Sequence, residues 1–175
     1  MCLSKSEVVL LTKQWRKDDF DWLYNIGKEI YTVVFEMCPR VKSFFPYVLQ
    51  CDRENKEWQE SHEFRRQALR FVQVLSHALD HFENAKYKAS DTELRDLLRG
   101  IGFKHRAFSK IGFRPTHWQI FVVAAVKALM KDAESLDVDD AAKVIRKTAW
   151  EKLTSYVVSC MEEGYYSDST ERLDR

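Results

Sequence analysis

The chain has 175 residues, of which 45% are hydrophobic, and 28 Lys and Arg against 27 Asp and Glu leave a formal net charge of +1. A chain of this length buries a substantial core without structural disulfides, and its near-neutral charge argues against a nucleic-acid partner. Only 5 Gly and 3 Pro interrupt it, which favours long helices over many short strands. We therefore expect an all-α protein with one core.

Two features of the sequence predict a cytoplasmic protein without a membrane span. The N-terminal segment lacks the basic stretch and apolar run of a secretory signal. The longest apolar run, residues 120–130, contains Lys127 and is too short to cross a bilayer. The four cysteines show no metal-binding C-x-x-C spacing, and we expect free thiols, including Cys38 and Cys51.

The first two helices are indicated by their boundaries. Ser4-x-x-Glu7 has the spacing of a capping box and predicts a helix start. A second amphipathic run covers residues 20–37, and Pro39 ends it. Gly27 lies inside this run, where a glycine costs about 1 kcal/mol relative to alanine. It therefore predicts a close crossing with another helix.

A third helix is expected at residues 62–82, after a turn at 44–47 and a polar loop that runs to Glu60. Its inner face follows the 3.6-residue period and comprises Phe64, Ala68, Phe71, Leu75, Leu79 and Phe82. Gln67 lies on the edge of this face, where a buried amide without a partner costs about 1–3 kcal/mol.

The second half of the chain predicts three more helices. Ser90-x-x-Glu93 is another capping-box spacing, and the apolar stripe that follows it ends at His105. Residues 116–131 form a nearly all-round apolar helix, and residues 139–163 a long amphipathic one.

The C-terminal boundary is predicted from composition. Gly164 is a candidate C-cap for the last helix, and the residues after it are polar. We expect one domain over residues 1–165 and a flexible tail over residues 166–175.

Three polar side chains on different helices, Tyr31, Gln67 and His105, face the same apolar interior. A histidine on an apolar stripe is more often a hydrogen-bonded core residue than a ligand, but this convergence indicates a pocket. The alternatives for the other two are a core tyrosine bonded to a carbonyl and a partly exposed helix-edge glutamine.

The order and spacing of five motifs resemble the globin family over about residues 3–163. These are Leu-Ser-x-x-Glu followed by Trp15, Phe35-x-x-x-Pro39 followed by Phe45, Ser61-x-Glu-Phe64-x-x-Gln67, Gly102-Phe-Lys-His105-Arg-Ala and Ala149-Trp150-x-x-Leu153. Each motif is weak alone, and five in register are strong. The resemblance implies a globin fold of seven to eight helices around one haem b, similar to neuroglobin-like members and to high-affinity invertebrate globins.

The resemblance also implies roles for individual residues. His105 would be the proximal iron ligand, and Tyr31 and Gln67 would face the gas on the distal side. A phenol and an amide N–H stabilise a ligand that gains partial negative charge, by about 1–1.5 kcal/mol each. The other implied haem contacts are Phe45, Arg70, Phe71, Ile101, Arg106, Trp118 and either Ile111 or Phe113. Arg70 and Arg106 suit haem propionates, although Arg70 could equally be a solvated surface residue.

The chain departs from the family in its spacing, since His105 follows Gln67 by 38 positions, several more than in vertebrate myoglobin or neuroglobin. We place the insertion at residues 83–90. His77 would restore a shorter spacing, but we place it and His62 on the polar face of their helix. The ferrous iron is therefore expected to be mainly five-coordinate, without a second histidine ligand.

The leading interpretation is reversible binding of oxygen, carbon monoxide or nitric oxide for storage, transport or sensing. The alternative is a hexacoordinate globin with a redox role, such as nitric oxide dioxygenation, nitrite reduction or redox signalling, which needs an external reductase. A cofactor-free helical module is a third possibility. The oligomeric state is left open, a dimer being one option.

Overall fold

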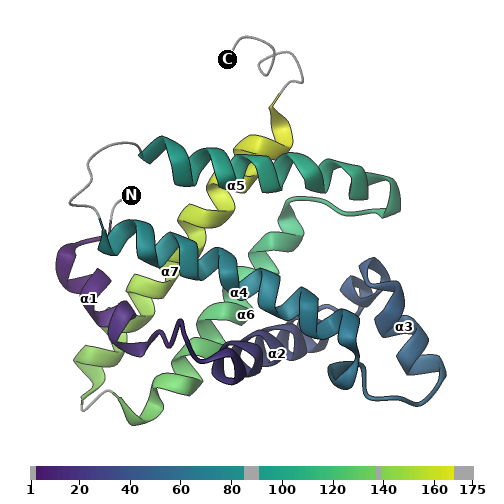
Figure 1. Ribbon diagram of the computed structural model, residues 1–175, viewed down its shortest axis with the longest axis horizontal. Coiled ribbons are helices and arrows are strands. Elements are labelled where there is room, and N and C mark those ends of the chain that lie inside the picture. The colour runs from purple at the N-terminus through teal and green to yellow at the C-terminus, as the bar shows by residue number, and fades with distance from the viewer. Residues whose placement is uncertain (1–2, 85–90, 137–138, 168–175) are drawn as a thin grey trace.

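The computed structural model describes residues 3–84, 91–136 and 139–167, and within these ranges the regular structure is entirely helical. The α-helices are α1 Lys5–Gln14, α2 Phe20–Met37, α3 Pro46–Arg53, α4 His62–Glu83, α5 Asp91–His105, α6 Thr116–Asp132 and α7 Asp140–Tyr166 (Figure 1). Short 3-10 helices are η1 Pro39–Phe44, η2 Trp58–Glu60, η3 Arg106–Ile111 and η4 Ala133–Ser135. The prediction of an all-α fold is confirmed.

The helix starts follow from local side-chain capping. The Ser4 hydroxyl accepts the Glu7 amide at 3.2 Å, and the Glu7 carboxylate accepts the Ser4 amide at 2.7 Å, so the predicted capping box is confirmed. Asp19, Ser61 and Asp139 cap α2, α4 and α7 by accepting a backbone N–H three residues later. The second predicted capping box includes Ser90, which lies outside the described residues, as do most of the expected insertion and nearly all of the tail.

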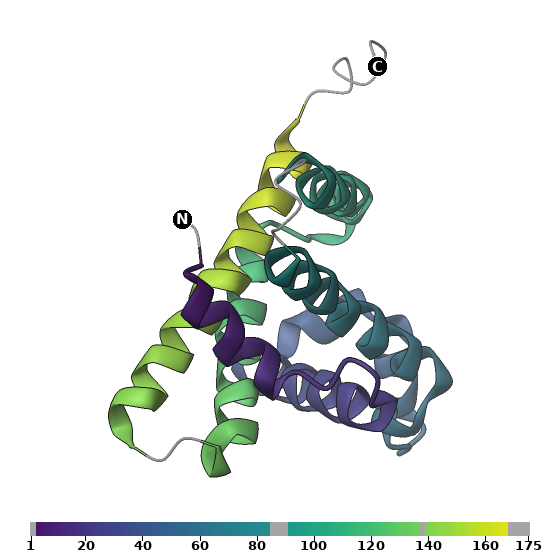
Figure 2. The ribbon, with the colours of Figure 1, turned by 60° about the vertical axis from the view of Figure 1, so that its left-hand side comes forward.

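The core forms where the inner faces of α1, α2, α4, α6 and α7 meet. Gly27 on α2 lies against α4, and a Cβ placed on it would be 3.0 Å from the Ala68 Cβ. The predicted close crossing is therefore confirmed. Helices α6 and α7 pack side by side after the turn around η4, and α5 lies across the C-terminal part of α7 (Figure 2).

Two expectations about the helix boundaries were wrong. The segment expected to be a polar loop contains α3 and η2. Pro46 at the first helical position of α3 and the buried side chains of Val48 and Trp58 stabilise these two elements. Val48 is the one buried residue of α3, so the segment shows little periodicity in sequence. Gly164 does not cap α7, because the helix continues to Tyr166 and the glycine packs against the α5 backbone.

None of the helices in the described ranges combines the length and apolarity that a bilayer crossing requires.

Candidate functional site

A cavity of about 710 Å³ lies between α2, α4, α5, α6 and α7. This volume is within the range of sites that hold small molecules and cofactors, about 300–1,000 Å³. Most of its wall is apolar or aromatic. Its basic members are Arg70, His77, Lys104 and His105, and no acidic residue is among the described residues that line it. The cavity therefore suits a largely apolar occupant with anionic groups.

His105 forms one wall of the cavity as the last residue of α5. Its Nδ1 lies 2.9 Å from the Ile101 carbonyl oxygen, which can only accept, so the proton is on Nδ1. Nε2 consequently keeps its lone pair. Burial lowers the pKa of the imidazole, which favours the neutral form that binds metal ions.

Aromatic rings hold the His105 imidazole in place. Its ring centroid is 5.3 Å from that of Trp118, 5.5 Å from Phe113 and 5.6 Å from Phe108. A ring fixed by packing on several sides loses little freedom when it binds a ligand, which favours a defined direction for Nε2.

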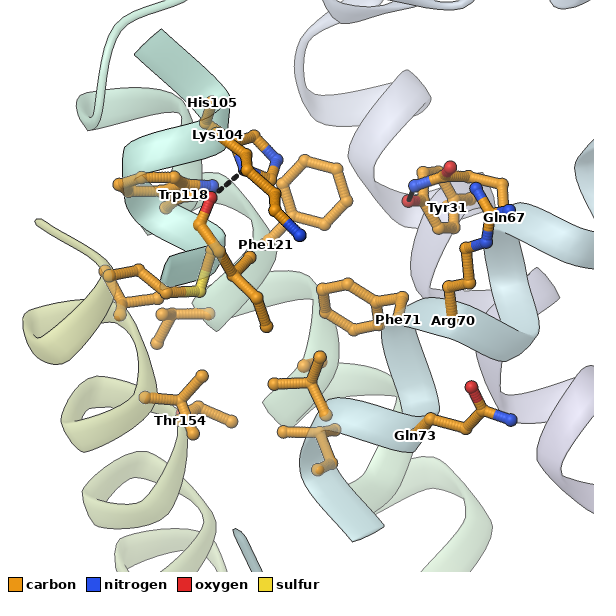
Figure 3. Close-up of a pocket in the computed structure, with 18 of the residues that line it drawn as sticks. Tyr31, Gln67, Arg70, Phe71, Gln73, Lys104, His105, Trp118, Phe121 and Thr154 are labelled. Carbon is orange, nitrogen blue, oxygen red and sulfur yellow. Dashed lines mark hydrogen bonds between the residues drawn. The ribbon is translucent and has the colours of Figure 1, made fainter. Parts of the chain in front are cut away.

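Tyr31 on α2 and Gln67 on α4 form the opposite wall (Figure 3). Tyr31 is 1% exposed, and its hydroxyl oxygen accepts a hydrogen bond from the Gln67 Nε2 at 2.9 Å. Because the amide is the donor in this pair, the phenol retains its own proton for another acceptor. Burial raises the pKa of Tyr31 well above its ordinary value, so the hydroxyl stays protonated at neutral pH.

Most of the sequence-predicted contacts come together around this space. Phe45, Arg70, Phe71, Ile101, Phe113 and Trp118 all line the cavity together with Tyr31, Gln67 and His105. Arg106 and Ile111 do not line it. The Arg106 Nη1 donates to the Ser167 carbonyl at 2.8 Å, and Ile111 is 54% exposed. Of the two alternatives for one contact, the structure places Phe113 in the wall.

The structure adds wall residues that the sequence did not identify. Lys104 precedes His105 on α5, and its side chain extends toward the space that Phe71 and Phe121 border (Figure 3). Phe121 lies on α6, where an all-round apolar pattern gave no indication of which face meets the cavity. Only the adjacency of Lys104 to His105 was a usable signal.

His77 is exposed, as expected of the polar face of α4, but its side chain also borders the cavity. It lies on the flank of α4, at the boundary between the inner and the solvent-facing side. His77 is ten positions beyond Gln67, or about 15 Å along the helix. Its place in the wall is therefore distant from the Tyr31–Gln67 pair.

Comparison with known proteins identifies the architecture. Residues 28–161 match the sequence model of the Globin family. The Globin-related protein glb-13 of Caenorhabditis elegans is 26% identical over 165 residues, which cover 93% of this chain and 52% of that protein. The chain thus spans about half the length of this curated relative.

A solved structure has the same fold, the crystal structure of a hexacoordinated haem protein from an anhydrobiotic tardigrade. The TM-score is 0.71 at 19% identity, and the match covers 94% of this chain and 96% of that one. The helices that build the cavity are therefore arranged as in a haem protein of known structure, although the side chains of the two proteins mostly differ.

Proposed function

Because the chain belongs to the globin family, we propose that it holds one haem b through His105 and reversibly binds oxygen or another small diatomic gas beside Tyr31 and Gln67. One observation carries this proposal: a mostly apolar cavity has an imidazole nitrogen with a free lone pair on one wall and a hydrogen-bonded tyrosine–glutamine pair on the other.

The residues of the cavity fit a haem. Its aromatic and aliphatic wall suits a flat apolar macrocycle, and basic side chains without neighbouring carboxylates in the wall suit two carboxylate groups. Arg70 on α4 and Lys104 on α5 are the residues that would receive these carboxylates. When bound, haem supplies an iron atom with a coordination position for a gas molecule.

His105 would serve as the proximal ligand. The Ile101 carbonyl fixes the tautomer by accepting the Nδ1 proton, and a carbonyl in this role orients the ring and raises the basicity of the other nitrogen. The neutral imidazole requires no proton loss before it binds a metal, because burial already disfavours its charged form.

Tyr31 and Gln67 would hold the gas. A ligand that gains partial negative charge is stabilised by the phenol proton, and the Gln67 amide polarises this phenol by donating to its oxygen. Phe45, Phe71 and Phe121 pack around Tyr31, with ring centroids 5.3–6.0 Å away, and exclude water from this side. A dry environment strengthens such a hydrogen bond.

A second candidate is a hexacoordinate haem protein with a redox role that uses an external reductase, which the description of the tardigrade protein favours. The wall of this cavity offers Gln67 rather than a histidine opposite His105, and His77 is about 15 Å farther along α4. Amide oxygen binds ferrous iron weakly compared with imidazole, so we favour an open position and a mainly five-coordinate ferrous iron.

An absorption spectrum of the purified protein tests both proposals. We expect a haem band, a five-coordinate high-spin ferrous form and a new band on addition of oxygen or carbon monoxide. A haem-free protein that does not take up added haem would refute the proposal. A low-spin ferrous spectrum at neutral pH, lost in His77→Ala, would replace it with the hexacoordinate alternative.

A further inference from the structure

Helices α5 and α7 touch at backbone distance at two points. A Cβ added to Gly102 on α5 would lie 1.8 Å from the Met161 carbonyl oxygen, and one added to Gly164 on α7 would lie 1.9 Å from the Arg99 carbonyl oxygen. In each case the obstacle is the backbone of the other helix rather than a flexible side chain. Each helix thus contributes one glycine and one carbonyl to the crossing, and neither can move toward the other.

Polar contacts at both ends of the crossing oppose separation of the helices. The Arg95 guanidinium binds the Glu163 carboxylate through Nε at 3.1 Å and Nη2 at 2.9 Å, a paired geometry that fixes orientation as well as distance. Arg106, directly after His105, donates to the Ser167 carbonyl at 2.8 Å. The segment that carries His105 is therefore tied to α7 on both sides of Gly102.

Helix α4, which carries Gln67, is held differently. It packs mainly on α2 and makes few contacts with α5 and α7 (Figures 1 and 2). Its crossing with α2 at Gly27 is less close, because a Cβ added there would lie 3.0 Å from the Ala68 Cβ and 3.1 Å from the Ala68 carbonyl oxygen. The wall that carries His105 is therefore held more rigidly than the wall that carries Gln67.

We propose that Gly102 and Gly164 are positioning residues for the proximal ligand. They hold α5 on α7, so that the His105 ring keeps a fixed position relative to α7 when a gas molecule binds the haem. Movement on ligand binding is then confined to α4 and the distal side chains. This inference rests on the proposed role of His105 as an iron ligand and adds a reason why its position is fixed.

The test is the iron–histidine stretching band of the ferrous protein, measured by resonance Raman spectroscopy. In Gly102→Ala and Gly164→Ala, the added methyl group forces α5 away from α7, and we expect the band to shift to lower frequency and to broaden. We also expect a larger share of the nitric oxide complex to lose its histidine bond. Gly27→Ala is the matched control: it perturbs a helix crossing on the distal side and should leave the band unshifted.

A measurement on the unaltered protein covers the case in which the alanine variants do not fold. Amide hydrogen exchange should change in α4, and stay the same in α5 and the C-terminal half of α7, when carbon monoxide binds the ferrous protein. Changed exchange in α5, or an unshifted stretching band in either alanine variant that binds haem, would overturn the inference. A wild-type chain that takes up no haem would instead overturn the proposed function.

Discussion

Gln14 and Gln67 both project into the interior, but the surroundings of their amides differ. The Gln14 Nε2 donates to the Leu129 carbonyl at 2.8 Å and to the Asp132 carboxylate at 3.0 Å, and its Oε1 accepts from the Trp150 Nε1 at 3.0 Å. This side chain therefore joins α1, α6 and α7 through hydrogen bonds made within the protein.

The network around Gln14 extends to a fourth helix. The Asp132 carboxylate also accepts from the Trp22 Nε1 on α2 at 2.9 Å. Gln67, in contrast, bonds to Tyr31 at the edge of a cavity of about 710 Å³. The first region is complete by itself, whereas the second is arranged around an occupant. We therefore expect the first region to determine the stability of the fold and the second to determine binding.

The largest effect is expected from a substitution that changes the cavity region alone. In His105→Ala the imidazole that lines the cavity beside Trp118 and keeps a lone pair on Nε2 is lost, so we expect stable haem incorporation to be abolished. The haem-free fold should persist, because the Gln14 network is untouched. Absorption spectroscopy and circular dichroism measure the two effects.

His117→Ala is the control for this variant, since His117 is not among the residues that line the cavity. A full haem complement with a wild-type spectrum in His105→Ala would show that the proximal assignment is wrong.

The second prediction concerns a substitution that changes the Gln14 network alone. Gln14→Leu keeps the approximate volume but leaves the buried Trp150 N–H and the Asp132 carboxylate with one partner fewer, so we expect the free energy of unfolding to fall by about 3 kcal/mol. Urea denaturation measures the loss, and haem binding below the transition should be unchanged. The exposed Gln119→Leu is the control, within about 0.5 kcal/mol of wild type.

The sequence predicted the second region better than the first. His105, Gln67 and Tyr31 stand at spacings that the 3.6-residue period brings to inner helix faces, and local pattern is enough to find them. The partners of Gln14 lie on other helices more than 100 positions away, so no local pattern indicates them. From the local pattern alone, Gln14 resembles a solvated residue near a helix end.

Two further features that the sequence did not predict also depend on structure beyond the local pattern. The α5–α7 crossing at Gly102 and Gly164 depends on backbone contact between helices distant in sequence, and a glycine near a helix end is read more simply as a C-cap. The choice between Ile111 and Phe113 depends on η3, a short 3-10 turn after His105 whose 3.0-residue period departs from that of the preceding α-helix.

The third prediction sharpens the account of the distal wall. Tyr31→Phe and Gln67→Leu should each raise the oxygen dissociation rate, by about 10-fold for the tyrosine and less for the glutamine, because a lost donor removes about 1–1.5 kcal/mol. Gln67 donates to Tyr31 and not directly into the cavity, so the double variant should be little worse than Tyr31→Phe. Stopped-flow measurements give the rates. Carbon monoxide, the less polar ligand, should respond less, and equal changes for both gases would indicate steric gating instead.

The smallest expected effect is a pH dependence of the haem-free protein. Burial lowers the pKa of His105 below its ordinary value near 6.5, so the unfolded chain binds the proton more readily than the folded one. Stability should therefore be fully present above pH 6.5 and fall as the pH drops below that value, until the folded pKa is reached. His105→Gln lacks this titration, so the difference in urea midpoint between it and wild type should change between pH 7.5 and pH 5. Parallel curves would show that His105 is hydrated without haem. The cavity region would then open in the absence of its occupant, although the Gln14 region remains folded.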